Sequence, residues 1–339
     1  MIEVIVIPLL KIVILLAGLL TAVAYATLLE RKIQAWVQSR LGPMRVGPQG
    51  VLQPVADVIK LLLKEDITPA RADKWVYTAA PIIALVPALI VFAVIPFGPS
   101  TSMFGAPVPL YLTDINVGLL YLVSVSSIGV YGIILAGYSS NSKYPLLAGL
   151  RASAQLISYE VAVTMTLVSM ILMAGTLSMV GIVDAQKNAG LWYVFVQPLA
   201  FLIFLIGSLA ETNRAPFDMP EAEQELVGGF HTEYSGMRFA LFFLAEYANM
   251  IVTSAVVTTL FLGGYLRPFP NIEALWILDY VPGWVWFLAK TFAFLYVFIW
   301  IRATLPRYRY DQLMRLGWKV LIPVGIANLV VTGIFKVLF

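Results

Sequence analysis

The chain has 339 residues, of which 60% are apolar and only 12% are charged, and its formal net charge is +3. Soluble domains are usually about 45–50% apolar and about 25% charged, so this composition excludes an ordinary soluble enzyme. The chain has no cysteine and a single histidine, His231, which excludes disulfides, cysteine-bound iron–sulfur clusters and multi-histidine metal sites. We therefore expect any redox chemistry to come from a partner.

Apolar runs long enough to cross a bilayer follow one another along the chain. The first is too long for a signal peptide and carries Glu3 in place of a basic leader, so we expect it to be retained. The sequence predicts an all-α fold: a polytopic membrane protein with about eight transmembrane helices, in which residues 1–339 form a single integral membrane domain. The predicted spans are approximately residues 2–29, 75–95, 117–138, 156–177, 191–209, 239–262, 284–301 and 320–338.

The basic residues indicate the orientation of these spans. Most Lys and Arg residues fall in the segments after the first, third, fifth and seventh spans, whereas the opposite loops hold little beyond Lys187 and Arg267. Positively charged loops favour the cytoplasmic side, so the sequence predicts both termini on the outer, periplasmic side of the cell inner (plasma) membrane. The net charge reflects this topology and gives no reason to infer nucleic-acid binding.

A stiff loop and a short amphipathic helix follow the first span. The Gly-Pro pairs at 42–43 and 47–48 favour tight turns. In residues 51–64 the apolar side chains recur at helical spacing on one face, while Asp57, Lys60 and Lys64 share another, and the segment is too short to cross a bilayer. We expect this helix to lie along the cytoplasmic interface, either as a connector or as a doorway for an amphiphile between lipid and a polar site.

Three carboxylates lie in or at the end of predicted spans: Glu160, Glu211 and Glu246. A charged residue in a membrane helix is costly, so such groups usually face an interior or a water path. Lys11 and Lys290, also within spans, are candidate counter-ions. The carboxylates are therefore either partners in buried structural ion pairs or members of a proton relay.

The loop after the fifth predicted span is rich in acids. Asp218 followed by Glu221 resembles the N-terminus of a short helix that ends at Gly228. Glu221 and Glu225 would be neighbours on that helix and repel each other unless protons or cations intervene. Glu223 and Glu233 add to the negative charge, and only Arg214 and Arg238 oppose it. This loop is either a solvated acidic segment or a partly buried, proton-exchanging cluster.

Two further segments carry charges that anchoring alone does not explain. Glu30 adds an acid to the basic pair Arg31 and Lys32 at the end of the first span. Residues 302–311 interleave arginines, among them Arg302 and Arg307, with aromatic residues. The predicted topology already requires basic residues in this segment. These arginines could also face the acidic loop or bind a partner protein.

Together these motifs closely resemble one family: the membrane subunit of proton-translocating NADH:quinone oxidoreductase, respiratory complex I, known as the H subunit in bacteria and as subunit 1 in mitochondria. The resemblance covers nearly the whole chain, and its most specific part is the acidic loop. The motifs that carry it are residues 30–32, 42–50, 52–54, 56–57, 64–65, 158–160, 211–229, 233–234, 246–247 and 302–311.

The resemblance implies a function that composition does not show. In such complexes this subunit anchors the hydrophilic arm and forms much of the tunnel that admits quinone, the substrate, from the bilayer. Electrons from NADH arrive through flavin and iron–sulfur clusters held by other subunits, so this chain binds no cofactor of its own and has no activity alone. The implied partners are the quinone-site and iron–sulfur subunits of the hydrophilic arm, the other membrane-arm subunits and the lipid bilayer.

The resemblance also implies roles for individual residues. Those that would line or border the quinone tunnel are Arg31, Arg40, Asp57, Phe217, Arg302 and Arg307. Those that would form an acidic funnel and proton relay are Glu160, Glu211, Glu221, Glu223, Glu225, Glu233 and Glu246.

The chain departs from the family pattern in two places. Some relatives carry a glutamate in the third span where this chain has Ser127, which holds no charge, and some have a ninth helix. Two other functions stay open: a homologous anchor subunit in a membrane-bound hydrogenase or plastid-type complex, and a stand-alone ion transporter. The transporter is disfavoured because the sequence shows neither paired repeats nor two broken helices. Neighbouring genes for an NADH-oxidising module or for a hydrogenase would distinguish the first alternative.

Overall fold

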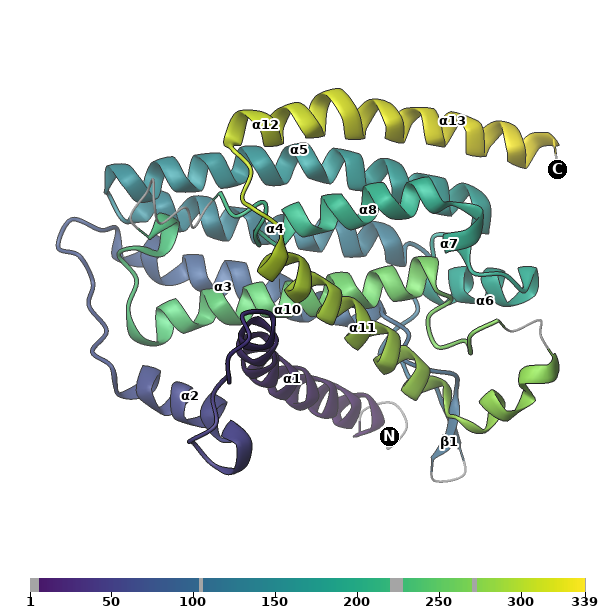
Figure 1. The fold of residues 1–339 in the computed structure, drawn as a ribbon, viewed down its shortest axis with the longest axis horizontal. Coiled ribbons are helices and arrows are strands. Elements are labelled where there is room, and N and C mark those ends of the chain that lie inside the picture. The colour runs from purple at the N-terminus through teal and green to yellow at the C-terminus, as the bar shows by residue number, and fades with distance from the viewer. Residues whose placement is uncertain (1–5, 104–105, 220–227, 270–272, 339) are drawn as a thin grey trace.

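The structure, a computed structural model, describes residues 6–103, 106–219, 228–269 and 273–338. Long helices dominate it and run along its longest dimension, with both chain ends toward the end that carries α6 and β1 (Figure 1). The α-helices are α1 (Ile7–Val37), α2 (Gln53–Leu63), α3 (Lys74–Ile90), α4 (Gly118–Ser139), α5 (Lys143–Ala174), α6 (Met179–Ala189), α7 (Tyr193–Val196), α8 (Pro198–Glu211), α10 (Gly236–Phe261), α11 (Gly283–Thr304), α12 (Tyr310–Leu316) and α13 (Ile322–Leu338).

Smaller elements join these helices. Strands β1 (Thr101–Met103) and β2 (Ala106–Val108) form an antiparallel hairpin in which Thr101 pairs with Val108. The 3-10 segments are η2 (Pro48–Gly50), η3 (Val91–Val94), η4 (Gly229–His231) and η5 (Glu273–Tyr280), and the π-helical turn η6 (Gly317–Leu321) joins α12 to α13.

Within the described residues, seven helical segments are long and apolar enough to cross a membrane. They are α1, α3 with η3, α4, α5, α10, α11 and the continuous run from α12 to α13. Helix α8 is also apolar but has only 14 residues, about 21 Å at 1.5 Å per residue. The expected all-α, polytopic membrane fold is confirmed, with one small hairpin and with an eighth apolar helix shorter than a full span.

The predicted fifth span is wrong as one continuous helix, because it breaks at Pro198. Proline lacks a backbone N–H and disfavours helical geometry in the residue before it. Gln197 accordingly leaves the helical region, with φ −127° and ψ 55°, and separates α7 from α8. Its side chain is buried and donates a hydrogen bond of 2.7 Å to Thr332 of α13. The break therefore contributes to packing between distant parts of the chain.

Two helices extend beyond their predicted cytoplasmic boundaries. Helix α1 continues to Val37, past the charged residues at 30–32, and α5 begins at Lys143 rather than near residue 156. An apolar run in the sequence ends at a charged residue, whereas a helix continues wherever its backbone hydrogen bonds are made. The prediction therefore located the apolar parts of these helices and not their ends.

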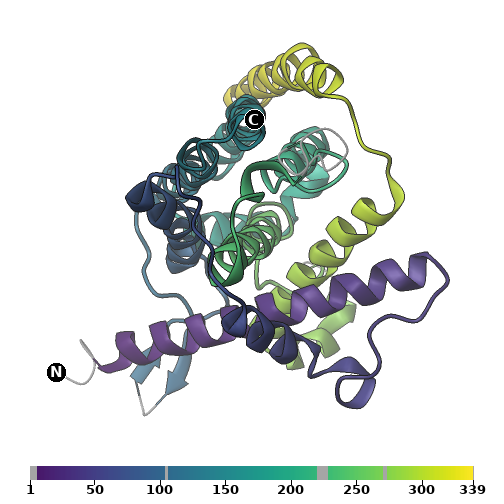
Figure 2. The same cartoon turned by 90° about the vertical axis from the view of Figure 1, so that its left-hand side faces the viewer.

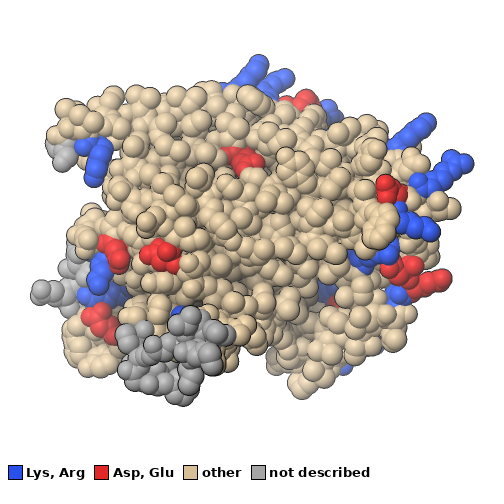
Figure 3. Space-filling model, turned by 180° about the vertical axis from the view of Figure 1, so that it is seen from behind, with Lys and Arg blue, Asp and Glu red and all other residues tan. Residues whose placement is uncertain are grey.

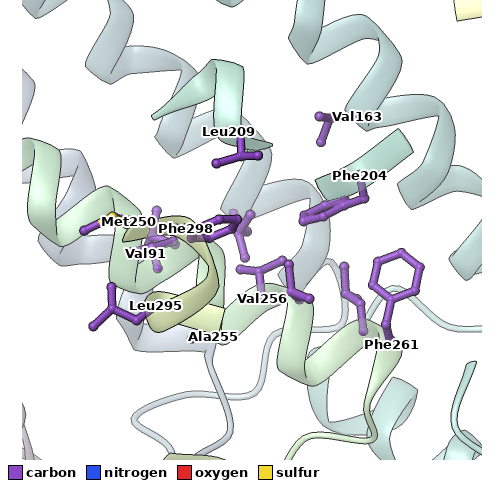
Figure 4. Packing of buried hydrophobic residues seen from close by; sticks show 14 of the residues in the cluster. Val91, Val163, Phe204, Leu209, Met250, Ala255, Val256, Phe261, Leu295 and Phe298 are labelled. Carbon is purple, nitrogen blue, oxygen red and sulfur yellow. The ribbon is translucent and has the colours of Figure 1, made fainter. Parts of the chain in front are cut away.

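Helix α10 packs at the centre of the bundle. Figure 4 shows Val256 and Phe261 of α10 near Phe204 of α8, and Phe298 of α11 packed beside them. These side chains belong to one buried cluster that extends to α5 through Val163. Lipid is as apolar as these side chains, so close packing rather than exclusion from water holds such helices together.

Helix α1 is oriented differently from its neighbours. Figure 2 shows it running across the bundle, at an angle to α4, α5 and α10. The charged side chains gather mainly at the two ends of the molecule, and most of the face in Figure 3 between them is uncharged. At one end lies α2, which confirms the short helix expected in residues 51–64, and its apolar side chains Val55, Ile59 and Leu62 are exposed.

Candidate functional site

A cavity of about 110 Å³ lies between α4, α5, α8 and α10, with η4 at its edge. Glu160, Glu211 and Glu246, the three carboxylates predicted within or at the end of spans, all line it. We call this space the acidic cavity. Its walls also carry hydroxyl and amide groups, and polar cavities of this size hold several water molecules. The fold thus brings together three acids from three separate helices.

Within the acidic cavity, Glu160 lies between two different neighbours. On one side its carboxylate makes a hydrogen bond with the hydroxyl of Ser127 on α4. On the other side it is close enough to Glu211 for the two carboxylates to interact electrostatically. Two carboxylates in a poorly hydrated space repel each other when both are ionised, and binding a proton relieves that repulsion. This geometry suits groups that exchange a proton.

A buried ion cluster adjoins the cavity. It consists of Glu30, Arg214, Glu246, Tyr247 and Arg302. Arg214 donates to both carboxylate oxygens of Glu30, at 3.0 and 3.1 Å, and also pairs with Glu246. Arg302 pairs with Glu30, and the Tyr247 hydroxyl donates a hydrogen bond of 2.7 Å to the Glu30 carboxylate. The Arg214 guanidinium lies 4.4 Å from the centre of the Tyr247 ring, a cation–π geometry.

The ion cluster connects two regions of the protein. Arg302 stands near the end of α11 with 27% of its side chain exposed, while those of Glu30 and Arg214 are each only 5% exposed. Glu246 belongs to both the cluster and the acidic cavity. Charged contacts therefore run without interruption from Arg302 to the cavity. Two carboxylates and two guanidinium groups balance in charge, which is what burial of such groups requires.

A second hollow, of about 290 Å³, lies where α1 meets the loop before η2. Arg31 and Arg40 line it, and Arg31 forms an ion pair of 2.6 Å with Asp57 of α2. Gln53 also donates to Asp57, at 3.2 Å. We call this space the entrance hollow. Two of the residues predicted to line a quinone tunnel, Arg31 and Arg40, thus line this hollow, and a third, Asp57, pairs with Arg31 beside it.

The Gly-Pro loop beside the entrance hollow is tightly folded, as its sequence predicts. Gly50 has φ +78°, and a side chain there would place its Cβ only 2.2 Å from the carbonyl oxygen of Pro43. Only glycine fits such a close approach. The loop therefore holds its shape through backbone contacts and leaves the neighbouring arginines free to line the hollow.

Phe217 and Arg307 lie apart from the residues that line the entrance hollow. Arg307 pairs with Asp218 of the acidic loop at 2.8 Å. Phe217 is buried and stacks on Tyr308, with ring centres 5.6 Å apart, next to Tyr159. The suggestion that the last arginine-rich loop faces the acidic loop is thus confirmed for Arg307.

Four predicted relay residues remain. Three of them lie outside the described residues, and the fourth, Glu233, does not line the acidic cavity. Glu221, Glu223 and Glu225, with the short helix expected around them, lie outside the described residues. Glu233 is not among the residues lining the cavity; its backbone carbonyl accepts a hydrogen bond of 2.6 Å from Tyr77.

His231, the only histidine of the chain, lies at the edge of the acidic cavity. The rings of Phe230, Phe239 and Phe243 contact it edge-on. Burial lowers the pKa of His231 to about 4, because the charged imidazolium would lose its hydration. The imidazole is therefore neutral at pH 7. Among the described residues, no group of three or more His, Asp or Glu side chains is placed to hold a metal ion.

The two lysines expected as counter-ions do not serve that role, so this prediction is wrong. Lys290 donates to three backbone carbonyls after the end of α10, at 2.6 to 3.0 Å. Lys11 donates to the carbonyl oxygens of Pro109 and Tyr111, at 2.8 and 3.3 Å. Carbonyl groups at a helix C-terminus carry partial negative charge and attract cations. This explains the contacts of Lys290 at the end of α10, whereas Lys11 binds loop carbonyls after β2.

Sequence reasoning missed the residue at the centre of the ion cluster. Arg214 is the counter-ion of both Glu30 and Glu246. In the sequence it is distinguished only as one of two bases in an acidic stretch. Glu30 is recognisable there as an unexplained acid, and Tyr247 gives no signal beyond its place next to Glu246.

Comparison with known proteins identifies the family of this chain. Residues 10–333 match the NADH dehydrogenase family. Geobacter sulfurreducens has an NADH-quinone oxidoreductase H subunit, numbered 1, that is 55% identical over 335 residues, which cover 96% of this chain and 93% of that protein. The H subunit numbered 2 of Geobacter metallireducens is 54% identical over 336 residues, covering 96% and 94%.

A relative from a third bacterium gives a similar result. The NADH-quinone oxidoreductase H subunit of Frankia alni is 54% identical over 332 residues, which cover 97% of this chain and 72% of that protein. These matches confirm the resemblance indicated by the sequence motifs, and with it the expectation of a multi-pass membrane subunit of an NADH-quinone oxidoreductase. The chain therefore belongs to the NADH dehydrogenase family.

Proposed function

We propose that this chain forms part of the quinone tunnel of complex I, anchors the hydrophilic arm, and couples quinone reduction to proton translocation through its buried carboxylates. The observation that carries this proposal is the uninterrupted set of charged contacts from Arg302 through Glu30 and Arg214 to Glu246. Within this set, Glu30 accepts a hydrogen bond of 3.0 Å from Gln34, which lines the entrance hollow, and at the far end Glu246 lines the acidic cavity.

The entrance hollow suits a substrate with a polar head and an apolar tail. Arg31, Arg40 and Asp57 supply hydrogen-bonding groups, and the exposed apolar face of α2 borders them. A quinone moving from the bilayer would keep its tail on that apolar face while its carbonyl oxygens meet the charged groups. Phe217, Arg302 and Arg307 would border the tunnel farther along the chain. Flavin and iron–sulfur clusters in hydrophilic-arm subunits would supply the electrons.

The acidic cavity suits the proton step. A quinone that accepts two electrons must also accept two protons to become a quinol, so reduction changes the charge at the tunnel. Unit charges about 4 Å apart interact by about 4 kcal/mol at an effective dielectric constant of 20. A change near Arg302 or Glu30 would therefore alter the balance on Arg214 and Glu246, and through them on Glu211 and Glu160. Glu221, Glu223, Glu225 and Glu233 would continue this acidic path on the cytoplasmic side.

The distribution of charge supports the proposed placement in the membrane. The segments at the end that carries α2 hold most of the arginines and lysines. By the positive-inside tendency this end faces the cytoplasm. The chain ends would then lie on the outer side of the cell inner membrane, with the whole chain acting as a single integral domain beside other membrane-arm subunits.

Replacement of Asp57 or Arg31 by alanine tests the quinone role. Both variants should slow NADH oxidation with a long-tailed quinone, while NADH oxidation by an artificial acceptor at the flavin stays near the wild-type rate. Asp66→Ala is a matched control, because Asp66 pairs with Arg238 at 3.2 Å in a nearby but separate surface contact. Equal loss in both assays, in complexes that still assemble, would contradict the proposal.

A further inference from the structure

The hydroxyl group of Ser127 stands between two acceptors. On one side it makes a hydrogen bond with the carboxylate of Glu160, which lines the acidic cavity. On the other side it lies 2.8 Å from the carbonyl oxygen of Val123, one turn back on α4. Its neighbour Ser126 lines the cavity, but among the described residues the Ser126 hydroxyl bonds only to that same carbonyl, at 2.9 Å.

A serine hydroxyl has one proton to donate and two lone pairs that accept. Ser127 therefore cannot donate fully to Glu160 and to Val123 at the same time. When Glu160 is ionised, the serine proton points to the carboxylate. When Glu160 is protonated, the carboxylic acid donates to Ser127 Oγ, and the serine proton turns to the Val123 carbonyl. Both arrangements use the same heavy-atom positions.

We propose that Ser127 is a positioning residue that keeps Glu160 hydrogen-bonded in both of its protonation states, so that Glu160 can gain and lose a proton within the cavity. This inference rests on the proposed proton-coupling function. The transferred proton passes between Glu160 and cavity water or Glu211, while Ser127 keeps its own proton and changes only the acceptor. No bond other than O–H bonds of Glu160 and its donor forms or breaks.

A hydrogen-bond partner that can both donate and accept stabilises both protonation states of Glu160. A buried polar group without a hydrogen bond is strongly disfavoured. A partner that could only donate would favour the carboxylate, and one that could only accept would favour the acid. The hydroxyl serves both, and its rotation about the Cβ–Oγ bond moves no helix. A relay that passes α4 therefore does not need an acid at position 127, even though Ser127 itself holds no charge.

Redox-triggered infrared difference spectra of the assembled complex test this inference. The carboxyl C=O band of Glu160 is identified as the band that Glu160→Gln removes. In Ser127→Ala this band should move to higher frequency, because the acid loses its acceptor, and NADH-driven proton pumping should fall by about tenfold, the effect of one hydrogen bond. Ser127→Thr should restore the wild-type band. Ser124→Ala, a control at an exposed serine of α4 that does not line the cavity, should leave band and pumping unchanged.

The outcomes separate this inference from the proposed function. If Ser127→Ala leaves both the band and pumping as in the wild type while Glu160→Gln abolishes them, Ser127 has no positioning role and the inference is overturned. If Glu160→Gln removes no band and pumps normally, Glu160 is not part of the relay, and the proposed coupling role of Glu160 falls together with the inference. Alanine suits a helix interior well, so assembly of Ser127→Ala is expected.

Discussion

Replacement of Glu30 by glutamine should destabilise the protein by about 3–5 kcal/mol, the usual cost of removing one partner from a buried ion pair. The magnitude follows from its surroundings. The Glu30 side chain is only 5% exposed and accepts hydrogen bonds from Arg214, Arg302, Tyr247 and Gln34. Glutamine keeps the size but removes the charge, so the cluster changes from neutral to one net positive charge, and an amide N–H₂ group faces guanidinium donors.

The assay is the thermal midpoint at which the assembled complex releases or unfolds this subunit in a fixed detergent. Asp66→Asn is the control: its pair with Arg238 lies at the surface, with 42% of the Asp66 side chain exposed, and exposed pairs contribute about 0–1 kcal/mol. The double variant Glu30→Gln with Arg302→Gln restores neutrality and should recover part of the loss. A Glu30→Gln midpoint no lower than that of Asp66→Asn would show that the ion pairs of Glu30 do not stabilise the subunit.

Three further outcomes are expected. Gly132→Ala should disrupt packing of α4 on α3, because its Cβ would lie 2.6 Å from the backbone nitrogen of Ala84, whereas at Gly129 the nearest atom is 3.9 Å away and the same change should be tolerated; assembly yield on native gels checks both. Lys290→Met should cost about 1–3 kcal/mol in thermal stability, because three backbone carbonyls lose their donor; turnover of the complex that assembles should be unchanged. His231 should make the folded state less stable as the pH falls from about 6.5 to about 4. The reason is that His231 takes up a proton at the higher pH in the unfolded chain and only at the lower pH in the folded chain. Comparing the unfolding midpoints of the wild type and His231→Gln across this range isolates the effect, and parallel curves would contradict it.

Local patterns predicted local structure well. The alternation of apolar and charged residues in 51–64 predicted a helix that the structure places at Gln53–Leu63. The turns at the Gly-Pro pairs and most spans follow equally from composition. The break before Pro198 also has a local cause, but an apolar count alone does not register it, since proline interrupts a helix without lowering hydropathy.

The ion pairs could not be predicted because they join residues far apart in the chain. Arg214 meets Glu30 across 184 positions, and Arg302 meets it across 272. Nothing local distinguishes Arg214 from Lys290 as a partner for membrane acids. Only the packed fold shows that Lys290 serves backbone carbonyls at the other end of α10. The sequence therefore shows which residues are charged, but it does not show which of them form ion pairs with each other.

The serine at position 127 illustrates the same limit. Its side chain holds no charge, so by charge alone it offers α4 no titrating group for a relay. In the structure its hydroxyl meets Glu160 directly, a contact that depends on how α4 packs on α5. Glu160 thereby has a hydrogen-bond partner from a different helix, and the change of residue type does not leave that acid isolated.

Proteoliposomes containing the Glu160→Gln complex show whether the buried carboxylates couple quinone reduction to proton translocation. The quantity to measure is the number of protons translocated per NADH oxidised. Glu160 is a better choice than Glu246, because its partner Ser127 is uncharged, whereas Glu246→Gln would also leave Arg214 with one carboxylate fewer. Glutamine retains size and hydrogen bonding but cannot carry the titrating proton. An assembled Glu160→Gln complex should lose most of its proton translocation, with or without slower quinone reduction. Wild-type pumping stoichiometry at a wild-type rate would show that Glu160 is not part of the relay.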